Sequence, residues 1–189
     1  MCKRGLCAAV IATAIGLQCF GEPEKAHPEY HEPESKFEEA QRRDGLVTIT
    51  RVYDLPAPAA DYGTVRAALL ITSTRKDRRG IAALKLSYQP PGRDAVEHEV
   101  FIDEDEFVSL VDALEYMIGS ERLLKSRSRT FTRVEYRSRD GFMAGFSFEP
   151  QDKTTDYFIE TGGDPAFMPS LAGLLETVEA AQKQLDDAR

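Results

Sequence analysis

The chain has 189 residues, of which 42% are hydrophobic, and its 24 basic and 32 acidic side chains give a formal net charge of −8. This length is sufficient for one domain with a hydrophobic core of its own. The acidic balance argues against general affinity for nucleic acid or for anionic membranes, because both attract basic proteins.

The first 21 residues have the pattern of a secretory signal peptide. Lys3 and Arg4 precede an apolar run over residues 6–20, and the small residues Cys19 and Gly21 favour cleavage after Gly21. The run is shorter than the ~20 apolar residues that a membrane span requires. The sequence therefore predicts an exported protein, periplasmic or extracellular. An uncleaved anchor and lipid attachment at Cys19 are the alternatives.

Cleavage would change the chemistry available to the mature chain. All the cysteines lie in the removed segment, so neither a disulfide nor a catalytic thiol would remain. Loss of Lys3 and Arg4, with no acid, would take the net charge from −8 to −10. The mature chain has no second apolar run long enough to cross a bilayer. The absence of Asn and the excess of Arg over Lys are typical of a GC-rich, bacterial genome.

Residues 22–44 are predicted to be an acidic, Pro-containing tether, because they hold too few apolar side chains to form a core. A short helical turn is expected within it at residues 35–43. His27 and His31 have a helical spacing that could hold a metal ion. Pro28 opposes a regular helix between them, so we predict no metal site and no cofactor.

The folded domain is expected at residues 45–189, and its first half at residues 45–119. Runs of β-branched or alternating apolar residues predict four strands. These strands are expected at residues 45–53, 64–74, 81–88 and 96–102. A helix should follow, with Asp103 as its N-cap, Glu106 completing a capping box and Gly119 at its end. Its apolar stripe consists of Phe107, Leu110, Val111, Leu114, Met117 and Ile118.

The second half, residues 126–189, repeats this order. Three strands are predicted at residues 128–138, 142–149 and 155–160, the first two joined by the hairpin signal Asp140-Gly141. A loop at residues 162–165 leads to a last helix, which begins regularly near Pro169 and carries Phe167 on its inner side. Residues 101–115 and 158–176 also share the order Phe, acidic turn, Phe, Ser-Leu, Leu-Glu.

These elements predict an α+β fold, with antiparallel sheet, two helices packed on one side and a pseudo-two-fold repeat of strands and helix. Each half is expected to close its sheet with its own helix. This order is similar in topology to the whirly family of single-strand-binding proteins and related architectures. The likeness implies a nucleic-acid ligand only if the chain stays in the cytoplasm. No motif of that family is present, so no residue is assigned from it.

The main candidate for binding is an arginine-rich strand expected over residues 127–139. Its proposed ligand-binding residues share one parity, and therefore one sheet face. They are Arg127, Arg129, Phe131, Arg133, Arg137 and Arg139. Such a row could bind a phosphate or carboxylate polymer, or stack on bases. The favoured alternative is a solvated face whose arginines pair with Glu97, Glu99 or Glu149 on neighbouring strands.

No motif of nucleophilic or zinc catalysis occurs in the sequence, which lacks Gly-x-Ser-x-Gly, His-Glu-x-x-His and a Cys–His pair. The leading prediction is a non-catalytic binding or interaction module for a protein or an anionic ligand. A small hydrolase that uses a pair of carboxylates is the alternative. Binding of single-stranded nucleic acid is a third possibility if the signal-peptide interpretation is wrong.

Overall fold

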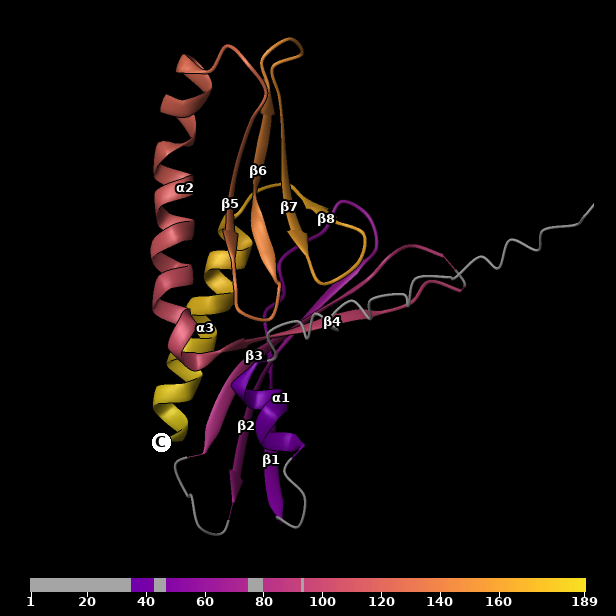
Figure 1. The fold of residues 1–189 in the computed structure, drawn as a ribbon, viewed down its shortest axis with the longest axis vertical. Helices are drawn as coiled ribbons and strands as arrows, with labels where there is room; N and C mark the ends of the chain where they lie inside the picture. The colour runs from indigo at the N-terminus through magenta and orange to yellow at the C-terminus, as the bar shows by residue number, and fades with distance from the viewer. Residues whose placement is uncertain (1–34, 43–46, 75–79, 93) are drawn as a thin grey trace, which may run out of the picture. The chain divides into compact units, whose positions relative to one another are not determined.

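A computed structural model describes residues 35–42, 47–74, 80–92 and 94–189 (Figure 1). The predicted signal peptide, most of the tether, His27 and His31 lie outside these residues. The described part has an α+β fold with two four-stranded antiparallel sheets, each followed by a helix, which suggests a repeat. The predicted fold class is therefore confirmed.

Each sheet is a meander in which consecutive strands are neighbours. The first consists of β1 (Thr48–Leu55), β2 (Thr64–Thr74), β3 (Ile81–Gln89) and β4 (His98–Asp103). The second consists of β5 (Thr132–Arg137), β6 (Met143–Glu149), β7 (Thr154–Glu160) and β8 (Ala166–Met168). The helices are α1 (Lys36–Gln41), α2 (Phe107–Arg127), which follows the 3-10 turn Glu104–Glu106, and α3 (Ala172–Ala188).

The two halves share one hydrophobic core. In the first sheet, Leu69, Leu84 and Ile102 are in register on one face and fully buried. The same cluster of buried residues includes Phe146 and Ile159 of the second sheet, together with buried residues of α2 and α3. Alternation along the strands therefore directs both sheets toward a common interior, which is larger than either half could form alone.

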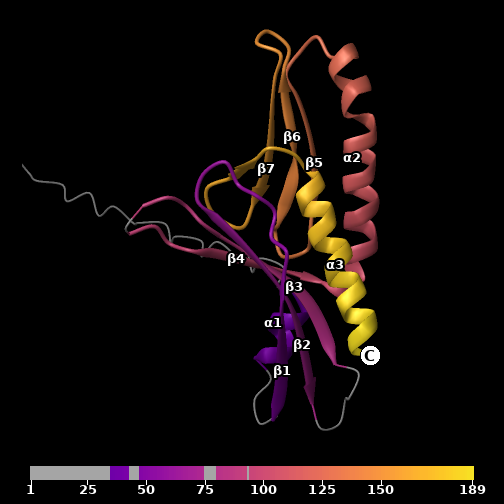
Figure 2. The same cartoon turned by 180° about the vertical axis from the view of Figure 1, so that it is seen from behind.

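Each of the two long helices packs mainly against the sheet of the other half. This corrects the expectation that each half closes its sheet with its own helix. Helix α3 follows the second sheet but packs against β1, β2 and β3 of the first. Helix α2 follows the first sheet and has its main strand contacts with β5 and β6 of the second. The helices also pack side by side, as Figure 2 shows. Thr177 of α3 fixes this arrangement by donating a hydrogen bond to the carbonyl oxygen of Pro56, at 2.8 Å.

The end of α2 differs from the prediction. The helix passes through Gly119 and ends at Arg127, where the Ser128 N–H donates to the Leu124 carbonyl at 2.9 Å. Gly119 is on the exposed side, with no heavy atom within 4 Å of the position that a Cβ would take. Leu124 packs against the core, so the last turns retain an apolar contact that favours continued helix.

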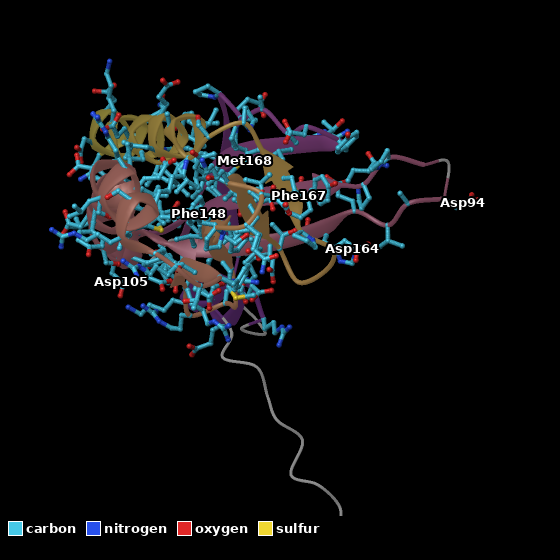
Figure 3. All side chains as sticks on the ribbon, turned by 90° about the horizontal axis from the view of Figure 1, so that it is seen from above. Asp94, Asp105, Phe148, Asp164, Phe167 and Met168 are labelled. Atoms are coloured by element: carbon cyan, nitrogen blue, oxygen red, sulfur yellow. The ribbon has the colours of Figure 1, made fainter. Side chains whose placement is uncertain are left out.

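The segment around Phe167 also differs from the prediction. Residues 166–168 form β8, and α3 begins only at Ala172. Ala166 and Met168 are buried and Phe167 is 42% exposed, which is the alternation of a strand and not of a helix (Figure 3). Phe167 lies opposite Phe158 of β7. The sequence echo is therefore only partial, because Phe107 opens a helix whereas Phe167 lies on a strand.

Candidate functional site

The six predicted binding residues do not lie on one strand. Strand β5 covers only Thr132–Arg137, and Arg133 and Arg137 share its exposed face as the parity predicts. Arg127 is the last residue of α2. Arg129 and Phe131 lie in the connection that follows α2, and Arg139 lies in the turn between β5 and β6. The continuous row of guanidinium groups expected over residues 127–139 is therefore not formed.

Arg133 is held by carboxylates and by an aromatic ring. Its Nε donates to Glu135 at 2.6 Å and its Nη2 to Glu160 at 2.9 Å. The guanidinium carbon lies 4.3 Å from the ring centroid of Phe158, which is 3% exposed. Desolvation opposes the charged form, but the hydrogen bonds to these two carboxylates outweigh it and raise the pKa of Arg133. The guanidinium of Arg133 therefore stacks over the ring of Phe158 and shields it from solvent.

Arg137 and Arg139 also lie beside carboxylates. Arg137 contacts Glu135 at 3.5 Å and remains largely exposed. Arg139 binds Asp103 at 3.0 Å and Asp105 at 3.1 Å through its two terminal nitrogens. The partners are not the predicted Glu97, Glu99 and Glu149, because the register of β7 and the turn after β5 decide which acids are near. Arg127 and Arg129 have no ion pair within the described residues.

Asp103 joins three elements, and it does not cap α2 as predicted. Its carboxylate accepts the backbone N–H groups of Lys36 at 2.8 Å and Phe37 at 3.2 Å, in addition to the guanidinium of Arg139. The side chain is 1% exposed. Asp103 therefore binds the first N–H groups of α1, which a helix leaves unpaired. The carboxylate fixes α1 to the end of β4 and to the β5–β6 turn.

Phe37 anchors α1 on the outer face of the first sheet. The ring is fully buried and lies in one apolar cluster with Leu70 and Ala83. It also stacks on Phe101, with ring centroids 5.4 Å apart. Ser35 and Glu38 form a capping box at the start of the helix. Only the helical turn of the predicted tether falls within the described residues, and it is part of the folded unit.

A groove of about 550 Å³ lies on this outer face, and Gln41 of α1 contributes to its lining. Its apolar lining comes from Val52, Ala68, Leu70 and Phe101. Its charged lining comes from Asp54, Arg66, Lys85, Glu97 and Glu99. Four of these charges form the pairs Arg66–Glu97, at 3.0 Å, and Lys85–Glu99. Asp54 has no ion pair within the residues that the structure describes.

Glu97, one of the acids that line the groove, is stabilised in its charged form. The hydroxyl of Ser87 donates to Glu97 at 2.6 Å, and this bond, with the charge of Arg66, lowers the pKa of Glu97. A general acid needs the opposite shift, toward a raised pKa. Within the described residues, no group of three or more His, Asp or Glu side chains is placed to hold a metal ion.

Strand β1 borders this groove and is an edge of the first sheet. It pairs with β2 on one side, and in the described residues no strand pairs with its other side. Ile49 and Val52 point to opposite faces and are 62% and 60% exposed. The eight residues of β1 contain no Pro and no Lys, two residues that commonly protect an edge from pairing, and its charged side chains are Arg51 and Asp54. This free edge was not predicted from the sequence, although the absence of Pro and Lys from β1 could have indicated it.

Asp140 pins the β5–β6 turn to β4. Its carboxylate accepts the Phe101 N–H at 2.8 Å. Burial raises the pKa of Asp140 to about 6; the Phe101 hydrogen bond partly opposes this, and the nearby Glu38 carboxyl adds to it. The side chain does not line the groove, so its raised pKa reflects its position between two elements and does not indicate a catalytic acid.

The Asp140→Asn variant is expected to be more stable than the parent above the pKa of Asp140. The folded pKa is raised, so the carboxyl's contribution to stability is present at low pH and is lost as pH rises from 3.8 through about 6. After discounting for solvent screening, the ionised form costs on the order of 1 kcal/mol. Asn keeps an oxygen for the Phe101 N–H.

The measurement is urea unfolding at several pH values from about 4 to about 8, with Asp156→Asn as the exposed control. The variant should show a flatter pH dependence and a gain of roughly 1 kcal/mol at the alkaline end. Equal pH dependence of variant and parent would contradict the assigned role of Asp140.

No protein-family model, curated protein or solved structure matches the chain. In the part of the chain that the structure describes, no helix is both long enough and apolar enough to span a membrane.

Proposed function

We propose that this protein is a non-catalytic binding module that takes an extended segment of a partner protein as an additional strand on β1. The observation that carries the proposal is the edge of β1, which pairs with no other strand in the described residues and lies next to the groove on the outer face. Val52 and Asp54 belong to both features, because they lie on β1 and line the groove. A strand added at this edge would bring every second side chain to the side of the groove.

The exposed side chains of β1 define the chemistry of the partner segment. Val52 offers an apolar contact on the outer face, and Asp54 offers a carboxylate two residues further along the same face. The groove's other ionic side chains are already paired with one another. A segment with β-branched residues and one basic residue would satisfy both positions, because opposite charges and apolar pairs across strands are favourable.

Affinity for selected peptides tests this proposal. Extended peptides selected by display on the full chain should bind, and Val52→Lys should weaken them by roughly tenfold or more, because a lysine removes the apolar contact and protects the edge. Leu123→Lys on α2 is a matched control, since Leu123 is also about half exposed, at 49%. The control should change affinity by less than about twofold.

A chemical change in the peptide separates strand addition from ordinary side-chain contact. Methylation of the peptide's backbone nitrogens at alternate positions removes the donors that a new strand requires. One of the two methylation patterns should abolish binding. If both patterns bind as well as the parent peptide, the strand-addition proposal is wrong.

We also propose that the module works outside the cytoplasm, in the periplasm or the extracellular space. Support comes from the basic start and the apolar run of residues 1–21. Mass measurement of the protein recovered from its native host should give a chain that begins at Glu22. Recovery of the intact N-terminus in the cytoplasm would contradict export.

A further inference from the structure

We propose that a second pocket, at the far end of α2, is a binding site for a small oxyanion such as phosphate. This site, formed between the last turns of α2 and the β6–β7 turn, lies away from β1 and is independent of the peptide site. Both elements meet at one end of the described fold, as Figures 1 and 2 show. The pocket has a volume of about 470 Å³.

Three cations and no carboxylate line this pocket. They are Arg122, Lys125 and Lys153. Lys125 pairs with Glu121, whereas Arg122 and Lys153 have no partner within the described residues. The pocket thus brings together two cations without counter-ions in a chain of net charge −8. An oxyanion would supply the missing negative charge.

Two serine side chains, Ser126 and Ser128, complete the polar lining. Ser126 donates its hydroxyl to the Leu123 carbonyl at 2.8 Å. The Ser128 hydroxyl oxygen lies 3.0 Å from that of Thr132, which also donates to the Thr130 carbonyl at 3.1 Å. The side of Ser128 that faces the pocket adds a small polar group beside the cations.

Lys153 is held in an uncommon backbone conformation. Its φ is 56°, and it is the only non-glycine residue with positive φ among the described residues. This conformation costs free energy for a residue with a Cβ, and such residues cluster at binding sites. The β6–β7 turn thereby places a lysine, and not a glycine, at the wall of the pocket.

The simplest structural explanation covers only part of the site. Basic residues in the last turn of a helix, here Lys125 and Arg127, favourably oppose the negative end of the helix dipole. That explanation does not apply to Lys153, which is on another element, or to Arg122, which lies before the last turn. Phe148 and Pro150 add an apolar wall, and Figure 3 labels Phe148 near the end of α2. An oxyanion that carries an apolar group would therefore fit better than the ion alone.

Titration with inorganic phosphate at constant ionic strength tests the site. The backbone amide signals of Ser128 and Lys153 should shift and saturate, whereas those of β1 should not. The double variant Arg122→Gln, Lys153→Gln should weaken binding by roughly tenfold. Arg51→Gln with Lys183→Gln is the matched control, because it removes the same two charges from exposed residues elsewhere. Its affinity should stay within about twofold of the parent.

A parallel experiment with vesicles that contain phosphatidylglycerol distinguishes the source of the oxyanion. Phosphate binding without vesicle binding assigns a free or small-molecule oxyanion, and binding of both assigns a lipid headgroup. Absence of saturable phosphate shifts overturns the proposal. Equal losses in the double variant and in its matched control also overturn it, because they would show general attraction and not a site.

Discussion

The Asp103→Ala variant should lose about 2–4 kcal/mol of the free energy of unfolding, because an unsatisfied buried hydrogen-bonding group costs about 1–3 kcal/mol. The substitution removes the acceptor of two backbone N–H groups of α1 and leaves the guanidinium of Arg139 without its buried partner. Urea unfolding followed by circular dichroism measures the loss. The two halves meet at this carboxylate, so the destabilisation should affect the whole transition.

Asp105→Ala is the control for this variant. Asp105 binds the same guanidinium and also Lys36, but it is 46% exposed, so its pairs contribute little. We expect a loss of no more than about 1 kcal/mol. A loss at Asp103 as small as that at Asp105 would show that α1 and the β5–β6 turn are not held through this group.

The Gly145→Ala variant should be destabilised by about 3 kcal/mol or more, because strands β5 and β6 would have to separate. A Cβ at Gly145 would lie 2.0 Å from the carbonyl oxygen of Val134, which belongs to the backbone and cannot rotate away. Arg133 of β5 and Phe158 of β7, which contact each other on this face of the sheet, would be displaced as well. Thermal unfolding of the variant is the measurement.

Gly119→Ala provides the opposite expectation with the same chemical change. No heavy atom lies within 4 Å of the position of its Cβ, and the residue is inside α2. Replacing a helical glycine by alanine on an exposed face should stabilise the protein by up to about 1 kcal/mol. Destabilisation at Gly119, or tolerance at Gly145, would contradict the packing described for these two positions.

Most strands could be predicted from sequence because alternation is a local signal. The predicted limits of β2 are the observed ones, and those of β3, β6 and β7 differ by one residue at one end. Strand β8 was missed, since three residues are too few to show a period. The packing of each helix on the sheet of the other half could not be predicted either. An apolar stripe shows that a helix packs against something, but it does not show which sheet it packs against.

The candidate site could be predicted only in part, for a related reason. Parity correctly placed Arg133 and Arg137 on one exposed face. The partner Glu160 comes from β7, so its contact with Arg133 depends on the strand register. Asp103 was predicted to cap the helix that follows it, but its carboxylate binds the first N–H groups of α1, and Lys36 lies 67 residues earlier in the chain. Long-range pairing of this kind leaves no local signal in the sequence.

Hydrogen exchange of the β1 amides, with and without a selected peptide, measures strand addition at this edge in the protein itself. An added strand on the free edge would pair with alternate backbone groups of residues 48–55 and slow their exchange. We expect new protection concentrated on β1 and little change in α2 and α3. Protection confined to other elements, with the β1 amides unchanged, would contradict strand addition at β1.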